Sequence, residues 1–225
     1  MKYFFYIFIF FCVACNTNSK QDNKPVADQP FWNDIQSFKK QDSVLFPPKN
    51  AILLIGSSSF TKWTDVQDYF PGYTIINRGF GGSTLLDEIR YVNDIVFPYQ
   101  PKQIIIYCGE NDLASSDTVT AAMVLDRFKQ LFQMIRDKTE ASIAYITMKP
   151  SPSRRHLFLK MREGNQLIKD FLVTQKNTAF IDVHQKMLNA ADEPIPEIFL
   201  DDSLHMNAKG YDIWQKEIQP YLLKD

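Results

Sequence analysis

Cysteine is scarce in this chain, with three among 225 residues. Two of them, Cys12 and Cys15, lie within the first fifteen residues, so Cys108 stands alone in the rest of the chain. An intramolecular disulfide in the body of the protein is therefore excluded, whatever the compartment. Cys108 follows an apolar run, which predicts a small buried hydrophobic side chain there.

An excess of charge of one sign is also lacking. Lys and Arg number 25 and Asp and Glu 26, for a net charge of −1, and the chain has no block of like charges and no internal repeat. Proteins that bind nucleic acid usually need a basic surface against the phosphates, so we expect no nucleic-acid partner. With 45% hydrophobic residues, this length suits one sizeable core and one domain.

No hydrophobic run is long enough to span a bilayer as a helix. The longest, residues 3–14, has twelve residues, whereas a span needs about 20. It ends in Val13-Ala14-Cys15 and is followed by polar residues, which resembles a bacterial lipoprotein signal. That resemblance implies a signal peptide over residues 1–15 and lipidation of Cys15.

A lipidated Cys15 would leave residues 16–30 as a flexible tether and hold the protein at the cell envelope, on the membrane. The match has two departures, because Cys12 stands where leucine is usual and Lys2 is the only early cation. The alternative is a signal peptide cut elsewhere, with Cys15 incidental.

Five short apolar runs bounded by turn residues predict buried strands. They cover residues 51–55, 73–77, 103–107, 142–146 and 179–182. Helical patterns lie between and around them: a short helix from residue 31, helices at 118–137 and about 157–174, and a last helix capped near Asn207. This alternation predicts an α/β fold, with a parallel sheet covered on both faces by helices.

Unusual residues follow each predicted strand, at the sheet edge where such folds bind ligands. The segments are "GSSSF" (56–60), "NRGFGGST" (77–84), "CGENDL" (108–113), "TMKPSPSR" (147–154) and, before the last helix, "DDSLH" (201–205). A serine becomes nucleophilic when a histidine takes its proton, and the histidine needs an acid to fix its tautomer. The backbone of "GFGG" and the amide of Asn111 could donate to an oxyanion.

Together these segments resemble the SGNH, or GDSL-like, hydrolase superfamily of esterases and acylhydrolases. The resemblance puts the nucleophile at Ser58, and the Asp–His pair at Asp202 and His205. It implies an oxyanion hole formed by Ser58, Gly82 and Asn111, and no metal or organic cofactor. The blocks occur in the family's order.

The resemblance covers residues 51–221 and implies a single hydrolase domain at 31–225. Its fold would be a three-layer, flavodoxin-like sandwich with a parallel sheet of about five strands. One departure is Ser57, which stands where the family usually has aspartate. With three consecutive serines the nucleophile could be displaced by one position, but Gly56 lies two residues before Ser58, as in the family.

Simpler interpretations exist for single elements of this pattern. The serines could only cap a helix, and Asp201, Asp202 and His205 could in principle bind a metal, although no second histidine or cysteine is suitably spaced. We expect no metal site. His156 and His184 lack an acid three residues earlier and are interpreted as surface or structural histidines.

The glycines at 79–82 lack the spacing of a dinucleotide-binding loop. Five further side chains are either lining residues of the site or ordinary core aromatics and surface charges: Trp63, Tyr107, Glu110, Arg154 and Arg155.

These observations predict a carboxylic ester hydrolase acting on short-chain, most simply acetyl, esters of a small molecule or glycan. No long apolar insertion offers an acyl tunnel, and the longest linkers, near 147–156 and 189–201, are Pro-rich and polar. The alternatives are a long-chain lipase or thioesterase, and a catalytically silent glycan-binding module at the cell surface.

Overall fold

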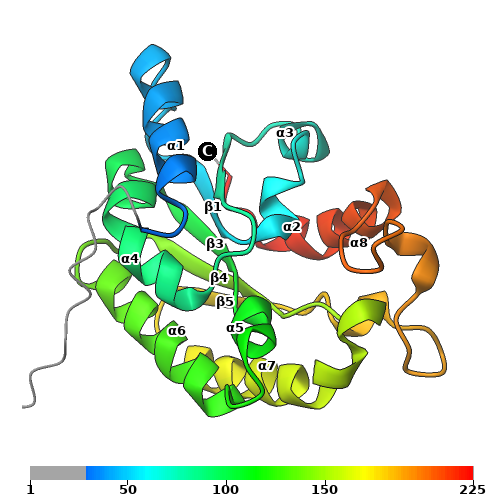
Figure 1. Ribbon diagram of the computed structural model, residues 1–225. Coiled ribbons are helices and arrows are strands. Elements are labelled where there is room, and N and C mark those ends of the chain that lie inside the picture. The colour runs from blue at the N-terminus through cyan, green and yellow to red at the C-terminus, as the bar shows by residue number, and fades with distance from the viewer. Residues whose placement is uncertain (1–28, 225) are drawn as a thin grey trace, which may run out of the picture.

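Five parallel strands form a single sheet at the centre of the molecule (Figure 1). In this computed structural model, which describes residues 29–224, the strand order is β2-β1-β3-β4-β5. The strands are β1 (Ile52–Gly56), β2 (Ile75–Gly79), β3 (Gln103–Tyr107), β4 (Ser142–Ile146) and β5 (Thr178–Ile181). The predicted α/β fold with a five-stranded parallel sheet is confirmed.

The three central strands are buried along their whole length, as their continuous apolar sequences predict. The second strand begins two residues later than predicted. The side-chain amide of Gln67 donates to the carbonyl of Tyr73 and accepts from the N–H of Ile75. Between these two groups, the carbonyl of Thr74 accepts the N–H of Ile52 on β1 at 2.9 Å, and the ladder with β1 runs from Ile75 to Gly79.

Helices cover both faces of the sheet (Figure 1). One face carries α4 (Leu85–Ile95), α6 (Ala121–Arg136) and α7 (Phe158–Val173), and the other α2 (Ser58–Thr61), α3 (Val66–Tyr69) and α8 (Ala208–Ile218). The remaining α-helices are α1 (Trp32–Val44) and α5 (Glu110–Ser115). Short 3₁₀ helices lie at Phe97–Tyr99, Pro152–Leu157, Gln185–Met187, Pro196–Ile198 and Gln219–Tyr221. The sheet thus separates two hydrophobic clusters, one under each helical layer.

Polar side chains cap the first turns of α6 and α8. The side chain of Asn207 accepts from the N–H groups of Lys209 and Gly210, so α8 begins where the sequence predicts. The hydroxyl of Thr120 accepts from Met123 N–H at the start of α6. These caps determine where the preceding loops end and the helices begin.

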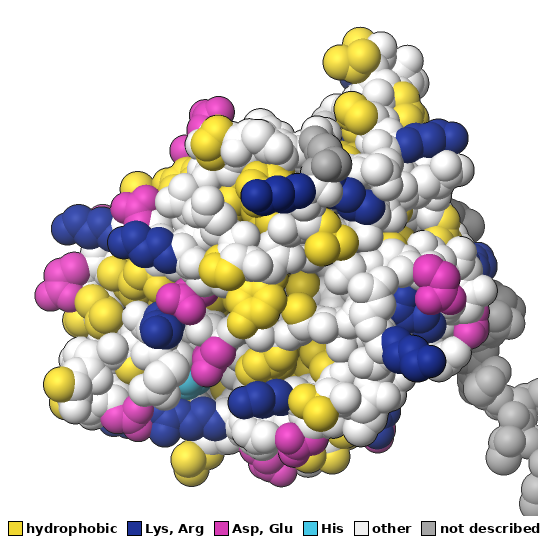
Figure 2. Space-filling model, turned by 180° about the vertical axis from the view of Figure 1, so that it is seen from behind, with side chains coloured by type: hydrophobic (Ala, Val, Ile, Leu, Met, Phe, Trp, Pro, Cys, Tyr) yellow, Lys and Arg dark blue, Asp and Glu magenta, His cyan; other side chains and the backbone are white. Residues whose placement is uncertain are grey.

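Helix α1 is longer than predicted, and its C-terminal end projects from the body (Figure 1). Hydrophobic side chains lie at this projecting tip in the view from behind, which elsewhere shows cations and anions interspersed (Figure 2). Val44 and Leu45, at the end of the helix, are 85% and 80% exposed. The tip is therefore an apolar feature outside both core clusters.

The predicted lipidation site Cys15 and most of the predicted tether lie outside the described residues. Within residues 29–224, no helix is long and apolar enough to cross a bilayer.

Candidate active site

A sharp turn at the end of β1 presents the serines. Gly56 has a φ of +135°, and a Cβ built on it would lie 1.9 Å from the carbonyl oxygen of Tyr107 on β3. That same carbonyl accepts the N–H of Ser57, at 3.1 Å. Only glycine allows this close approach of the two strand ends, so Gly56 sets the path into α2 and the position of Ser58.

The three consecutive serines have different environments. Ser57 and Ser59 are 3% and 2% exposed, and the Ser59 hydroxyl has no hydrogen-bond partner among the described residues. Ser58 is only partly buried, and its Oγ lies 3.1 Å from Nε2 of His205. Of the three, Ser58 is the serine that the fold brings to a histidine.

A continuous hydrogen-bonded series runs from Ser58 to Asp202. His205 Nδ1 lies 2.6 Å from Asp202 Oδ2, and the other Asp202 oxygen accepts the N–H groups of Leu204 and His205, at 2.9 Å each. With its proton on Nδ1, His205 donates to Asp202 and leaves Nε2 free to accept the Ser58 hydroxyl. This is the arrangement that a serine nucleophile, a base and an orienting acid require.

The environment of Asp202 favours its charged form. The hydrogen bond from the His205 ring, followed by those from the His205 and Leu204 backbone, lowers the pKa of the Asp202 carboxyl below its ordinary range. The turn is braced by Leu200, whose N–H donates to the carbonyl of His205 at 2.8 Å. The acid is thus ionised and directed at the imidazole through most of the pH scale.

The loop after β2 lies directly beside the serine. A Cβ on Gly81 would be 3.8 Å from Ser58 Cβ, and the next residue, Gly82, has a φ of +92°. Asn111 comes from the segment after β3, and its side-chain amide donates to the Ser83 carbonyl at 2.9 Å. The fold thus gathers Ser58, Gly82 and Asn111, which the family resemblance names as oxyanion donors.

Asp112 ties these two loops together. Its buried carboxylate accepts the N–H of Leu85, at the start of α4, at 2.9 Å and the guanidinium of Arg127, on α6, at 2.8 Å. Burial raises the pKa of Asp112, and the bonds from Leu85 and Arg127 counter that rise. Asp112 was not predicted as a site residue, and its position beside Asn111 in "GEND" was the available signal.

A buried charged cluster lies beside Asn111, at the neighbouring residue Glu110. Glu110 bonds Lys149 Nζ at 2.9 Å, Arg154 Nη1 at 3.0 Å and the hydroxyl of Tyr107. Burial alone raises the pKa of the Glu110 carboxyl, but Lys149 and Arg154 outweigh it, and the pKa falls below its ordinary value. Lys149, which was not predicted as a site residue, is buried here because it has this partner.

Two of the other side chains considered as lining residues lie elsewhere. Trp63 is fully buried in the core under α8, and Arg155 forms an ion pair with Glu193 while its side chain remains 63% exposed. His156 is exposed, as predicted for a surface histidine.

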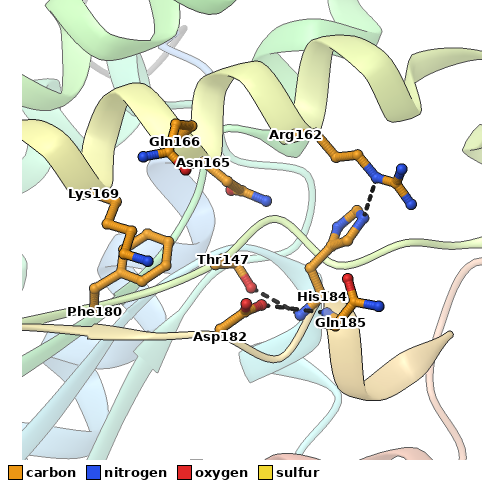
Figure 3. A pocket seen from close by; sticks show the side chains of 9 residues that line it. All are labelled: Thr147, Arg162, Asn165, Gln166, Lys169, Phe180, Asp182, His184 and Gln185. Carbon is orange, nitrogen blue, oxygen red and sulfur yellow. Dashed lines mark hydrogen bonds between the residues drawn. The ribbon is translucent and has the colours of Figure 1, made fainter.

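His184 lines a separate cavity of about 250 Å³ between α7 and the end of β5 (Figure 3). Its Nδ1 bonds the Met148 carbonyl at 2.8 Å, and Nε2 accepts from Arg162 at 3.4 Å. Burial lowers the pKa of His184. Its ring nitrogens are thus engaged in local bonds, and the cavity contains neither Ser58 nor His205.

Across the described part of the chain, no group of three or more His, Cys, Asp or Glu side chains is placed to hold a metal ion. Cys108 is buried and its thiol is free, close to the carbonyl of Ser83.

A sequence model of the GDSL-like lipase/acylhydrolase family matches residues 55–213, which include every residue of this site. The chain belongs to that family. The matched range includes the segments that carry Ser58, Gly82, Asn111 and the Asp202–His205 pair. No curated protein sequence matches the chain significantly.

Solved structures share the fold at low sequence identity. A GDSL-like lipase from Bacteroides thetaiotaomicron superposes with a TM-score of 0.72 at 18% identity, covering 83% of this chain and 96% of its own. A lipase/acylhydrolase from Enterococcus faecalis superposes with a TM-score of 0.60 at 20% identity, covering 78% of this chain and 98% of its own. A catalytic mutant of an acetylxylan esterase from Geobacillus stearothermophilus superposes with a TM-score of 0.62 at 15% identity, covering 77% of this chain and 94% of its own.

Proposed function

We propose that this family member is a serine carboxylic ester hydrolase. The observation that carries the proposal is the hydrogen-bonded series from Ser58 through His205 to the charged Asp202. Ser58 Oγ attacks the ester carbonyl as His205 Nε2 takes its proton, and Asp202 stabilises the resulting imidazolium. No metal or organic cofactor has a part in these steps.

The tetrahedral intermediate collapses when its carbon–oxygen bond to the alcohol breaks. His205 returns its proton to the departing alkoxide, and water, deprotonated by His205, then hydrolyses the acyl-enzyme. The oxyanion is received by the N–H groups of Ser58 and Gly82 and by the amide of Asn111. One amide hydrogen of Asn111 bonds the Ser83 carbonyl, which orients the side chain and leaves the other hydrogen for the substrate.

We further propose a short acyl group, most simply acetyl, carried by a carbohydrate. A long acyl chain would need an apolar trench, since its binding gains about 0.8 kcal/mol per buried methylene. Beside Asn111 the chain instead has the charged groups of Glu110, Lys149 and Arg154. Lipid anchoring through Cys15 at the cell envelope would bring the enzyme to glycan substrates.

Two other functions remain as rivals. A long-chain lipase or thioesterase uses the same chemistry on a longer acyl group, so only acyl-chain preference separates it from the proposed enzyme. A silent glycan-binding module needs no ordered series of nucleophile, base and acid, whereas Ser58, His205 and Asp202 retain one.

The test is ester hydrolysis by wild type, Ser58→Ala and the matched control Ser59→Ala. The control removes a neighbouring hydroxyl that is buried and has no partner among the described residues. We expect Ser58→Ala to lose turnover by about 10⁴-fold or more while Ser59→Ala stays near wild type. A dead Ser59→Ala with an active, folded Ser58→Ala would refute the assignment of the nucleophile.

Acyl preference comes from kcat/KM on nitrophenyl esters from acetyl to palmitoyl, followed by acetate release from acetylated xylan and pectin. A maximum at octanoyl or longer would reject the short-acyl proposal. Rapid acetyl-ester cleavage without acetate release from any glycan would leave an esterase and remove the carbohydrate. No turnover and no labelling by a serine-reactive phosphonate would favour the binding module.

A further inference from the structure

Arg154 lies between the two halves of the candidate active site. The backbone N–H of its neighbour Ser153 donates to the carbonyl of Ser203, in the loop that carries Asp202 and His205, at 3.1 Å. The Arg154 side chain reaches the other way, to Glu110, which precedes the oxyanion-hole candidate Asn111. These two contacts place Arg154 at the catalytic edge, beside the groups proposed to act on the ester.

The cluster around Arg154 has more positive than negative charge. Within residues 29–224, Glu110 is the single carboxylate paired with Lys149 and Arg154, and the side chains of Glu110 and Lys149 are 4% and 2% exposed. Because the Glu110 carboxylate is shared between two cations, one positive charge is left over. A positive charge in a poorly solvated position attracts an anion much more strongly than one in water.

Arg154 is the member of this cluster that reaches solvent, with 18% of its side chain exposed. Glu110 occupies its Nη1, whereas Nε and Nη2 have no hydrogen-bond partner among the described residues. Nε and Nη2 form the side-on fork of the guanidinium, whose parallel N–H groups match the two oxygens of a carboxylate.

The neighbouring Arg155 provides a contrast within the same turn. Its Nε and Nη2 both bond the carboxylate of Glu193, so its fork is occupied, and its side chain lies largely in solvent. The two arginines adjoin in sequence, yet only Arg154 contacts the segment that carries Asn111.

We propose that the side-on fork of Arg154 binds a carboxylate of the substrate, so that the enzyme acts on esters of a sugar acid. This inference rests on the proposed esterase function and narrows its substrate class. The carboxylate belongs to the sugar and takes no part in bond making or breaking. Its pairing with Arg154 holds the ester over Ser58. A neutral sugar would leave the Arg154 fork unpaired and would therefore be a poorer substrate.

A matched pair of substrates tests the proposal: acetylated methyl galacturonoside and acetylated methyl galactoside, which differ only in a carboxylate or a hydroxymethyl group at one carbon. Hydrogen bonds to charged groups contribute enough for a preference of about tenfold or more in kcat/KM for the acid. The preference should decline as salt is raised, because screening weakens the attraction.

Three variants locate the source of the preference. Arg154→Gln should remove it, mainly through a higher KM for the galacturonoside. Arg154→Lys keeps a cation beside Glu110 but lacks the fork, so it should fold like wild type and lose most of the preference. Arg155→Gln, the matched control, should keep both the preference and the activity.

The outcomes separate this proposal from the esterase function itself. If wild type hydrolyses nitrophenyl acetate but cleaves both sugar esters equally, the Arg154 subsite is wrong and the esterase stands. Equal losses on both sugar esters in the Arg154 variants, with the preference retained, would mean that Arg154 only supports Glu110. If no acetyl ester is cleaved at all, the proposed function fails, whatever Arg154 does.

Discussion

Replacing Glu88 with glutamine should remove a pH dependence from the stability of this protein. Glu88 lies on α4 with a fully buried side chain, and neither carboxyl oxygen makes a hydrogen bond of standard geometry to a described residue. Burial raises the pKa of Glu88 from 4.5 to about 8; the nearby Ser83 hydroxyl opposes the rise, and Asp87 and Asp112 add to it. Folding therefore favours the protonated carboxyl.

The sign of the effect follows from proton binding. Below pH 4.5 Glu88 is protonated in both the folded and the unfolded chain, and its pKa difference has no effect on stability. Between pH 4.5 and about 8 the unfolded chain loses the proton while the folded chain keeps it, so the free energy of unfolding falls. At about 1.36 kcal/mol per pH unit, the fall from this group approaches roughly 5 kcal/mol by pH 8.

The assay is urea unfolding of wild type and Glu88→Gln, followed by circular dichroism, from about pH 5 to 9. Glutamine has nearly the same shape as glutamate but cannot ionise. The free energy of unfolding of Glu88→Gln, relative to that of wild type, should therefore rise by several kcal/mol as the pH increases across this range. Glu163→Gln, at an exposed carboxyl on α7, is the control and should show a constant difference. A pH-independent difference for Glu88→Gln would refute the reasoning.

Two further predictions concern the candidate active site and the N-terminus. Asn111→Ala should lower kcat by about 10²–10³, the usual effect of removing an oxyanion donor, and a change confined to KM would assign Asn111 to substrate binding instead. Cys15→Ser should release the protein from the membrane fraction, and unchanged sedimentation with membranes would indicate another mode of attachment.

The main elements of the fold follow from the spacing of apolar residues. A parallel strand that is covered on both faces needs a continuous apolar run, and such runs predicted β3 and β4 at their observed bounds. The bounds of other strands were less predictable. β2 is an example, because it begins two residues later than its apolar run predicts, and its ladder with β1 runs from Ile75 to Gly79.

The order of the motifs along the chain indicated which segments should lie together, because the carboxyl ends of parallel strands lie on one edge of the sheet. It did not tell which side chains face one another there. Ser57, Ser58 and Ser59 are chemically identical, and the distinction depends on the turn at Gly56, which buries the first and third and exposes the second to His205. That contact joins residues 147 positions apart.

The sequence by itself determined the α/β class and the parallel sheet, because the spacing of apolar residues is a local property that is enough to predict strands and helices. The candidate residues for acyl transfer came from the order of motifs that resemble those of the family. The tertiary structure alone decided that Arg154 contacts Glu110 while Arg155 contacts Glu193, and that Lys149 is buried against Glu110. Whether a charged side chain forms a buried ion pair or lies in solvent depends on distant segments that the fold brings together. No local sequence pattern specifies those contacts.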